Sequence, residues 1–307
     1  MSLYTQMRRI YRLIRDRHEY FALRQFSKIA PIGHYESPYP SEIELVQKYE
    51  QFSLKKELYA IDLNEQAQLN LYENFKNYVD DCPMADKEKN QKYRFYDFDD
   101  NVWFGRDDAR HLYAHLMYFR PKNVIEIGSG FSTALMLDTN EILNHQMNLL
   151  CIEPRAQRLK ALLKSSDNLK LIEEDMQDID REVFSNLGGG DMLFIDSSHV
   201  SRPFSDVNTI YFEILPKLKK GVLVHIHDII YPFEYPKIWT LEQRRAYNEA
   251  YLLRAFLQYN TDFEILFWAS YLCHFSKIKD YGLCGGGSIY LRKKTWNEKS
   301  CNSCTSL

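Results

Sequence analysis

The sequence lacks any apolar run long enough to cross a membrane, and its first residues lack the apolar core of a signal peptide. Its six cysteines are scattered, at positions 82, 151, 273, 284, 301 and 304, and do not form a disulfide framework. Internal repeats and low-complexity tracts are also absent. From these absences we expect no stable membrane insertion, no disulfide scaffold and a reducing cytoplasmic setting.

The chain as a whole lacks a strong excess of either charge, because 39 basic and 42 acidic residues leave a formal net charge of −3. This balance gives no general attraction to nucleic acid or to a membrane surface. The first 30 residues differ, since seven basic and two acidic residues give them a charge of +5. We interpret this arginine-rich segment as a helix that is solvated or forms a homo-oligomer. Membrane-surface contact and nucleic-acid binding are the less favoured alternatives.

From about residue 106 onward, short apolar runs alternate with helical stretches. The runs predict strands at Asn123–Ile127, Leu149–Glu153, Leu169–Ile172, Met192–Asp196 and Val222–His227. Amphipathic helices are predicted between them, at 132–143, 156–163, 179–187 and 203–215. Near-continuous apolar strands that alternate with helices indicate a parallel sheet covered on both faces.

After a predicted helix at 241–259, two further strands are predicted at Phe263–Trp268 and Ser288–Arg292. Together these elements predict an α/β fold with a doubly wound, Rossmann-like, seven-stranded and mostly parallel sheet. We expect this core to span residues 96–294.

The rest of the chain is expected to be accessory to that core. Residues 1–95 are predicted to form an N-terminal helical appendage with substrate-side loops, and residues 295–307 a flexible tail. Within the appendage, helices are predicted at 41–52, which begins with an N-cap serine, and at 64–78.

The most informative segment, Asn123–Thr133, joins a predicted strand to a predicted helix. Gly128 and Gly130 let the backbone approach a ligand closely, and the helix that follows favours an anion at its start. A dinucleotide-binding turn needs a third glycine, and Thr133 stands at that position. Glu126 would repel a pyrophosphate but suits the cationic amino group of a methionine moiety. A generic tight turn is the alternative interpretation.

Other polar residues follow the predicted strands where ligands of such sheets bind, beyond the carboxyl ends. They are Glu153, Asp175, Asp196, His199, His227 and Asp228. Glu153 can accept both hydroxyls of a ribose, and Asp175 can contact an adenine edge. The alternative for Glu153 is an ordinary surface acid at a strand end, and for Asp175 a place in an acidic loop. For the other four, the alternative is a hydrogen-bonded structural role.

The segments Glu-Ile-Gly-Ser-Gly-Phe-Ser-Thr133, Phe-Ile-Asp-Ser-Ser-His199 and His-Ile-His-Asp228 resemble class I S-adenosylmethionine-dependent methyltransferases. The similarity is to the small-molecule and sugar O-methyltransferase branch of the macrocin O-methyltransferase type, and it covers about residues 95–294. It implies that S-adenosylmethionine binds to Glu126, Gly128, Ser129, Gly130, Ser132, Thr133, Glu153, Asp175 and Asp196. The Asp-Pro-Pro-aromatic signature of nucleic-acid methyltransferases is absent, so no nucleic-acid partner is expected.

The predicted catalytic residues are Asp196, His199, His227 and Asp228. A sugar hydroxyl is a poor nucleophile and needs a base or a metal. Metal-dependent O-methyltransferases place one ligand after the fourth strand and two after the fifth. Asp196, His227 and Asp228 match that layout, so Mg²⁺ or Mn²⁺ is one alternative. In the other, His199 or His227 is the general base. His225 is expected to point away from His227 and to be structural.

Aromatic residues follow the fifth predicted strand at Tyr231, Phe233, Tyr235 and Trp239. They are interpreted either as walls for a ring-shaped substrate or as plain packing. The expected function is methylation of a hydroxyl on a sugar or glycan precursor. The alternatives are an O-methyltransferase of another small natural product, and a non-catalytic glycan-binding or scaffold protein of the same fold.

Overall fold

The computed structural model describes residues 31–52, 57–85, 92–94, 101, 103–280 and 286–294. The basic N-terminal segment and the predicted tail lie outside the described residues. The chain divides into two compact units, and the smaller one holds the described residues up to 52 together with Pro236–Ala246. The remaining described residues form the larger unit. The domain boundaries expected near 95 and 294 border residues outside the description and stay predictions.

A seven-stranded sheet lies at the centre of the larger unit, in the order β3-β2-β1-β4-β5-β7-β6. The strands are β1 (Asn123–Ile127), β2 (Asn148–Ile152), β3 (Lys170–Ile172), β4 (Met192–Ile195), β5 (Leu223–Ile226), β6 (Phe263–Trp268) and β7 (Ile289–Lys293). The first five are parallel, and β7 runs antiparallel between β5 and β6. The predicted α/β, doubly wound, mostly parallel sheet is confirmed, and each predicted strand end is correct to within one residue.

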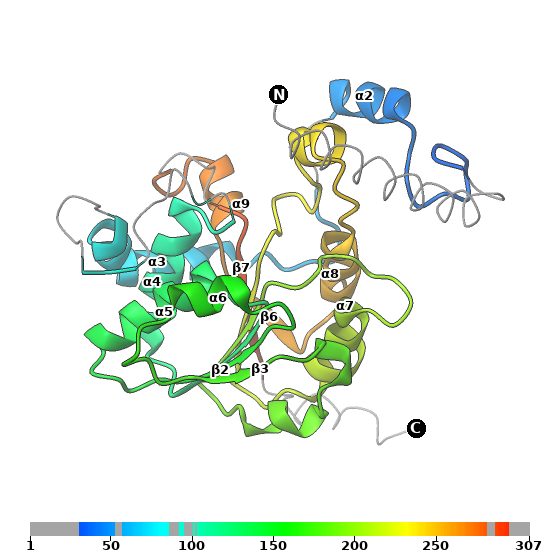
Figure 1. Cartoon of the computed structure of the whole chain (residues 1–307). Coiled ribbons are helices and arrows are strands. Elements are labelled where there is room, and N and C mark those ends of the chain that lie inside the picture. The colour runs from blue at the N-terminus through cyan, green and yellow to red at the C-terminus, as the bar shows by residue number, and fades with distance from the viewer. Residues whose placement is uncertain are drawn as a thin grey trace, which may run out of the picture. The chain divides into compact units, whose positions relative to one another are not determined.

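Helices cover both faces of this sheet (Figure 1). On one side lie α4 (Arg106–Phe119), α5 (Phe131–Ile142) and α6 (Gln157–Leu162), and on the other α7 (Asp206–Thr209) and α8 (Glu249–Leu257). The helix α3 (Glu65–Asp80) packs against α4 and β6. Strands β4 and β5 are buried along their whole length, which explains why they appear in the sequence as continuous apolar runs.

Three predicted helices differ from the structure. The segment predicted as 179–187 is a 3₁₀ helix at Arg181–Asn186. The one predicted as 203–215 is α7, followed by a π-helical turn at Ile210–Ile214 and a 3₁₀ turn at Leu215–Lys217. Of the one predicted as 241–259, only α8 is an α-helix, preceded by a π-helical turn at Ile238–Glu242.

Tertiary contacts explain the late start of α8. The backbone N–H groups of Asn248 and Glu249 donate to the carbonyl oxygen of His199, at 2.9 and 3.2 Å. A long helix would bind these N–H groups to its own preceding turn instead. The short α9 (Ala269–His274) was not predicted from the sequence.

The smaller unit contains α2 (Glu42–Glu50), which begins at the predicted N-cap. The Ser41 hydroxyl oxygen accepts a hydrogen bond from the backbone N–H of Glu44 at 3.2 Å. The π-helical turn packs beside it, because Thr240 donates to the Tyr49 hydroxyl at 2.9 Å and Arg244 pairs with Glu42 at 2.8 Å.

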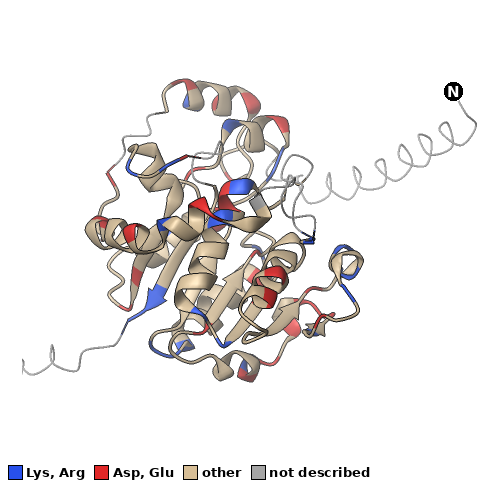
Figure 2. Ribbon diagram, turned by 90° about the vertical axis from the view of Figure 1, so that its left-hand side faces the viewer, with Lys and Arg blue, Asp and Glu red and all other residues tan. Residues whose placement is uncertain are grey.

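Acidic and basic residues are interspersed along the described helices rather than separated by sign (Figure 2). One cluster of charges is buried, where Arg94 pairs with Asp138 at 3.0 Å and with Asp167 at 2.5 Å. It ties the short described segment 92–94 to the core. Within the described part of the chain, no helix has the length and apolar character needed to cross a membrane.

The turn after β1 meets the end of β4 at the carboxyl edge of the sheet. Gly128 has φ +78°, and a Cβ at this position would lie 1.8 Å from the backbone oxygen of Asp196. The N–H of Asp196 donates to the carbonyl oxygen of Ile127 at 2.8 Å. Glycine is therefore required at 128, both for its backbone conformation and for the close approach of the two loops.

Candidate active site

A cavity of about 260 Å³ lies beyond the carboxyl ends of β1, β2, β3 and β4. This is the edge at which doubly wound sheets bind their ligands. The charged residues in its wall are Glu153, Asp175, Asp196, Asp206, Arg155 and Arg202. The four carboxylates outnumber the two guanidinium groups, so the wall suits a ligand with a positive charge.

Glu153 is fixed at the rim of this cavity by two backbone contacts. Its Oε2 accepts a hydrogen bond from the N–H of Ser129 at 3.2 Å, and its Oε1 accepts one from the N–H of Arg155 at 2.7 Å. The acid thus connects the loop after β1 with the loop after β2.

Glu126 lies beneath the loop after β1 rather than in the cavity wall. Its carboxylate accepts hydrogen bonds from the hydroxyls of Ser132 at 2.6 Å and Thr133 at 2.5 Å. Burial raises the pKa of Glu126 to about 7, although these hydrogen bonds act in the opposite direction. Thr133 Oγ1 also accepts the N–H of Gly130 at 2.9 Å, so it caps the start of α5.

Of the residues predicted to bind S-adenosylmethionine, the structure brings one group to the cavity and leaves another beside it. Gly128, Glu153, Asp175 and Asp196 line the cavity. The others, which are not among its lining residues, are Glu126, Ser129, Gly130, Ser132 and Thr133.

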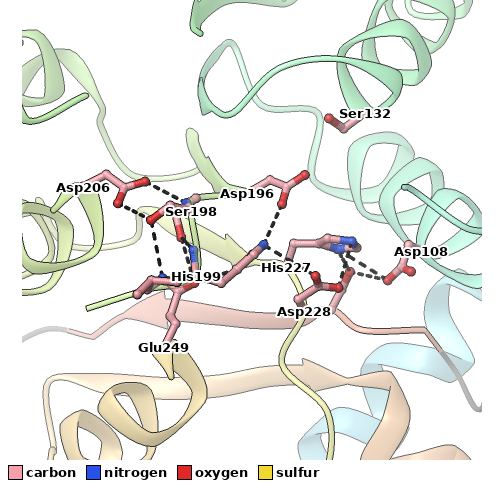
Figure 3. A network of polar contacts seen from close by, with 12 residues as sticks. Asp108, Ser132, Asp196, Ser198, His199, Asp206, His227, Asp228 and Glu249 are labelled. Atoms are coloured by element: carbon pink, nitrogen blue, oxygen red, sulfur yellow. Dashed lines mark hydrogen bonds and ion pairs between the residues drawn. The ribbon is translucent and has the colours of Figure 1, made fainter. Parts of the chain in front are cut away.

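Next to the cavity, His199 lies between carboxylates on three sides (Figure 3). Its Nε2 is 3.2 Å from Asp196 Oδ1 and 3.5 Å from Asp228 Oδ2. Its Nδ1 is 2.8 Å from Glu249 Oε2. Burial alone would lower the pKa of His199, but hydrogen bonds to Asp196 and Glu249 and the charge of Asp228 raise it well above its usual value.

A second buried imidazole, His227, faces the other side of Asp228. Its Nε2 lies 3.5 Å from Asp228 Oδ1, and its Nδ1 lies 3.9 Å from Asp108 Oδ1. Burial lowers the pKa of His227, and the charges of Asp228, Asp108 and Asp196 outweigh this effect and raise it. The four predicted catalytic residues therefore form one connected cluster.

Two members of the cluster have a backbone conformation that is rare outside glycine. His199 and Asp228 both have φ +58°. Such conformations cost free energy and persist where the surrounding structure enforces them, which is frequent at active sites. Here the His199 carbonyl accepts two N–H groups at the start of α8, and Gly287 packs against Asp228, since a Cβ there would lie 3.3 Å from Asp228 Cα.

Comparison with known proteins places this fold and cluster in a family. An uncharacterised protein of Archaeoglobus fulgidus is 34% identical over 191 residues, which are 60% of this chain and 85% of the relative. Residues 125–229, from β1 to just past Asp228, match the family described as a methyltransferase domain. The chain belongs to this methyltransferase family. The prediction of an S-adenosylmethionine-dependent methyltransferase is confirmed, and the macrocin-type branch stays a prediction.

Two solved structures resemble the methyltransferase at low sequence identity. An SAH-bound Podospora anserina methyltransferase is 14% identical, with a TM-score of 0.43, and the match covers 84% of this chain and 99% of that one. The O-methyltransferase TomG of Streptomyces achromogenes, in complex with SAM, is 15% identical, with a TM-score of 0.42 and coverage of 66% and 86%. Likenesses of this strength carry no information about the substrate.

The methyltransferase has two site residues that the sequence analysis missed. Glu249 is fully buried and contacts His199, and Asp108 is 5% exposed and faces His227. Glu249 lies on the same face of α8 as the buried Leu253 and Leu257. An acid in register with an apolar stripe is unusual, and that signal was available in the sequence.

The predicted orientation of His225 was wrong. Its ring lies 5.9 Å from that of His227, and both rings approach the Ser288 hydroxyl, at 2.9 Å and 3.4 Å. Residues two apart in a strand share a face, so the two histidines point the same way. Burial lowers the pKa of His225 well below its usual value, which keeps this ring neutral.

Three of the four aromatic residues after β5 are packing residues, and the fourth, Trp239, is half-buried. Tyr231, Phe233 and Tyr235 are 5%, 1% and 3% exposed, so they are not walls for a ring-shaped substrate. The aromatic ring nearest to His199 belongs instead to Tyr247, 4.7 Å away and half-buried.

The residues predicted to bind Mg²⁺ or Mn²⁺ do not fit a metal centre. The His199 ring stands between Asp196 and Asp228, and the Nε2 atom of His227 faces Asp228 rather than a shared open point. Over the described ranges, no group of three or more His, Cys, Asp or Glu side chains is arranged to hold a metal.

Proposed function

We propose that this methyltransferase transfers the methyl group of S-adenosylmethionine to a hydroxyl oxygen, with His199 as the proton acceptor. The observation that carries this proposal is the contact between Glu249 Oε2 and His199 Nδ1 at 2.8 Å, beside the cavity wall. A buried carboxylate in this position orients the ring. Its Nε2 faces Asp196 and Asp228 and takes up a proton only when the ring has first been deprotonated. A sugar or glycan precursor as the acceptor is supported by the resemblance of the sequence motifs.

The cavity residues Gly128, Glu153, Asp175 and Asp196 are proposed to hold the methyl donor. Gly128 lets the backbone approach it, and the excess of carboxylates suits its cationic sulfur and amino groups. When bound, S-adenosylmethionine supplies a methyl group whose bond to sulfur breaks, leaving the electron pair on sulfur, as the bond to the acceptor oxygen forms. The chain contributes mainly positioning and exclusion of water.

The His199 Nε2 atom accepts the proton that leaves the acceptor hydroxyl, and Nδ1–H stays bonded to Glu249. The raised pKa of His199 makes the neutral ring a stronger base. Only the neutral ring accepts a proton, so the transfer rate rises as pH rises through that pKa. Glu249 then stabilises the imidazolium that forms.

Replacing His199 with Gln is expected to lower kcat by about 10²–10⁴-fold, because it removes the proton acceptor. Glu249→Gln should also lower kcat, since it removes the negative charge that stabilises the imidazolium. Transfer of a labelled methyl group to a panel of sugars and nucleotide sugars measures kcat, and calorimetry measures the Kd of S-adenosylmethionine.

The donor Kd serves as the internal control, because neither residue is among the lining residues of the cavity. A near-normal kcat in His199→Gln would contradict the role of His199. Failure of the wild-type protein to bind S-adenosylmethionine would contradict the proposed reaction as a whole.

A further inference from the structure

His227 is buried with an acceptor oxygen beside each of its ring nitrogens (Figure 3). Its Nε2 lies 3.5 Å from Asp228 Oδ1, and its Nδ1 lies 3.4 Å from Ser288 Oγ. A neutral imidazole donates from only one nitrogen. Acceptors on both sides therefore favour the doubly protonated, cationic ring.

The Ser288 hydroxyl is an acceptor toward His227 because its hydrogen is used elsewhere. It donates to Asp108 Oδ1 at 2.5 Å, and the N–H of Gly287 donates to the same oxygen at 3.0 Å. The neutral ring of His225 also reaches Ser288 Oγ, through Nε2 at 2.9 Å. Both histidines thus donate to one oxygen that already gives its hydrogen to Asp108.

Asp108 lies on the Nδ1 side of His227, where burial raises the pKa of Asp108 and the charge of His227 acts in the opposite direction. It extends from α4, is 5% exposed and packs closely on Gly286, where a Cβ would lie 2.6 Å from Asp108 Oδ1. A buried carboxylate is costly without a cation nearby. Among the described residues, the ring of His227 is its cationic neighbour, 3.9 Å away.

Asp228 is bracketed by two imidazoles. His199 Nε2 lies 3.5 Å from its Oδ2, and His227 Nε2 lies 3.5 Å from its Oδ1. Each carboxylate oxygen thus faces a ring nitrogen. A divalent metal bound to Asp228 would have to lie close to both of these rings.

We propose that His227, held as an imidazolium between Asp108 and Asp228, supplies the fixed positive charge that a divalent cation supplies in metal-dependent O-methyltransferases. This inference rests on the proposed transfer to a hydroxyl. In that reaction the charge offsets Asp196 and Asp228 when the acceptor oxygen loses its proton to His199. Methyl transfer by this chain is then independent of divalent metal.

Binding of Mn²⁺ alone, followed by electron paramagnetic resonance, tests the inference without measuring turnover. The wild-type protein is expected to leave the Mn²⁺ spectrum unchanged, with and without S-adenosylmethionine. His227→Asp is expected to gain one Mn²⁺ site, because it replaces the resident cation with a third carboxylate beside Asp196 and Asp228. His227→Asn introduces a neutral amide, which is less costly to bury than a third carboxylate. It is expected to gain a weaker Mn²⁺ site.

Two matched controls locate the site. Asp196→Asn, added to His227→Asp, should remove the gained Mn²⁺ site. His145→Asp, an exposed histidine outside the cluster, should gain none. Turnover of the wild type should be unchanged by a chelator.

The inference is overturned if wild-type protein binds Mn²⁺ at a site that Asp196→Asn removes, or if a chelator abolishes turnover while the donor Kd is unchanged. It is also overturned if neither substitution of His227 creates a Mn²⁺ site. Failure of the proposed function looks different, because donor binding or methyl transfer would then be missing in the wild type whether or not a chelator is present.

Discussion

At the scale of single residues, two glutamates beside the loop after β1 differ in their surroundings. Glu153 stands at the rim of the cavity, where backbone N–H groups hold it. Glu126 lies in the interior, 1% exposed, and depends on the hydroxyls of Ser132 and Thr133. Ionisation of Glu126 therefore lowers the stability of the folded chain.

This effect predicts a pH-dependent loss of stability. The folded-state pKa of Glu126 is about 7 and its usual value is 4.5, so the folded chain resists ionisation that the unfolded chain allows. The free energy of unfolding should fall by roughly 2–3 kcal/mol between about pH 4.5 and about pH 8 on account of this group.

Glu126→Gln removes the ionisation and should reduce the dependence of stability on pH by that amount. Urea unfolding at both ends of the pH range measures the difference between the two proteins. Other groups titrate alike in both, so the comparison isolates Glu126. Parallel curves for the two proteins would show that Glu126 ionises freely in the folded chain.

At the scale of elements, the loops after β1 and β4 are interdependent, since Gly128 packs on the backbone of Asp196. Gly128→Ala introduces a left-handed alanine, which costs about 1–2 kcal/mol, and a Cβ 1.8 Å from a backbone oxygen, which forces the loops apart. We expect a larger total loss of unfolding free energy and a clear loss of donor affinity in calorimetry.

Gly190→Ala is the matched control, because Gly190 has φ +89° but nothing within 4 Å of the added Cβ. It should lose only the conformational term and keep normal donor affinity. Equal losses in the two variants would mean that the contact between the loops has no bearing on the site.

The strands were predictable from the sequence because burial on both faces makes each of them a continuous apolar run. The carboxyl-edge residues Glu153, Asp196 and Asp228 followed from the strands. The break before α8 was not predictable, because it depends on the His199 carbonyl, about 50 residues away in the chain. Asp108 was missed for a related reason, because it meets His227 only after the sheet has formed.

At the scale of the whole molecule, buried histidines make the larger unit sensitive to acid. His111 and His115 lie inside α4, and burial lowers the pKa of each from 6.5 to about 3. The folded chain keeps both rings neutral while the unfolded chain takes up protons below pH 6.5. Stability is therefore lost as pH falls below the unfolded value.

The two rings together should cost about 5 kcal/mol by about pH 4.5, a large part of the stability of a typical domain. We expect His111→Leu to move the acid-unfolding midpoint, followed by circular dichroism, to lower pH. The two ring nitrogens of His111 have no hydrogen-bond partner among the described residues, so the substitution breaks no such bond. His145→Gln, at an exposed position, is the control, and an unchanged midpoint in His111→Leu would contradict the explanation.

The antiparallel strand β7 has a consequence for the order in which the enzyme becomes competent. The residues that line the donor cavity all lie between 127 and 206. The contacts of Asp108 with Gly287 and Ser288 join residues 179 and 180 positions apart. Contacts this distant in sequence are costly to close and form late. We therefore expect a growing chain to form the donor cavity first. The contacts that hold Asp108 beside His227 form only when β7 joins the sheet.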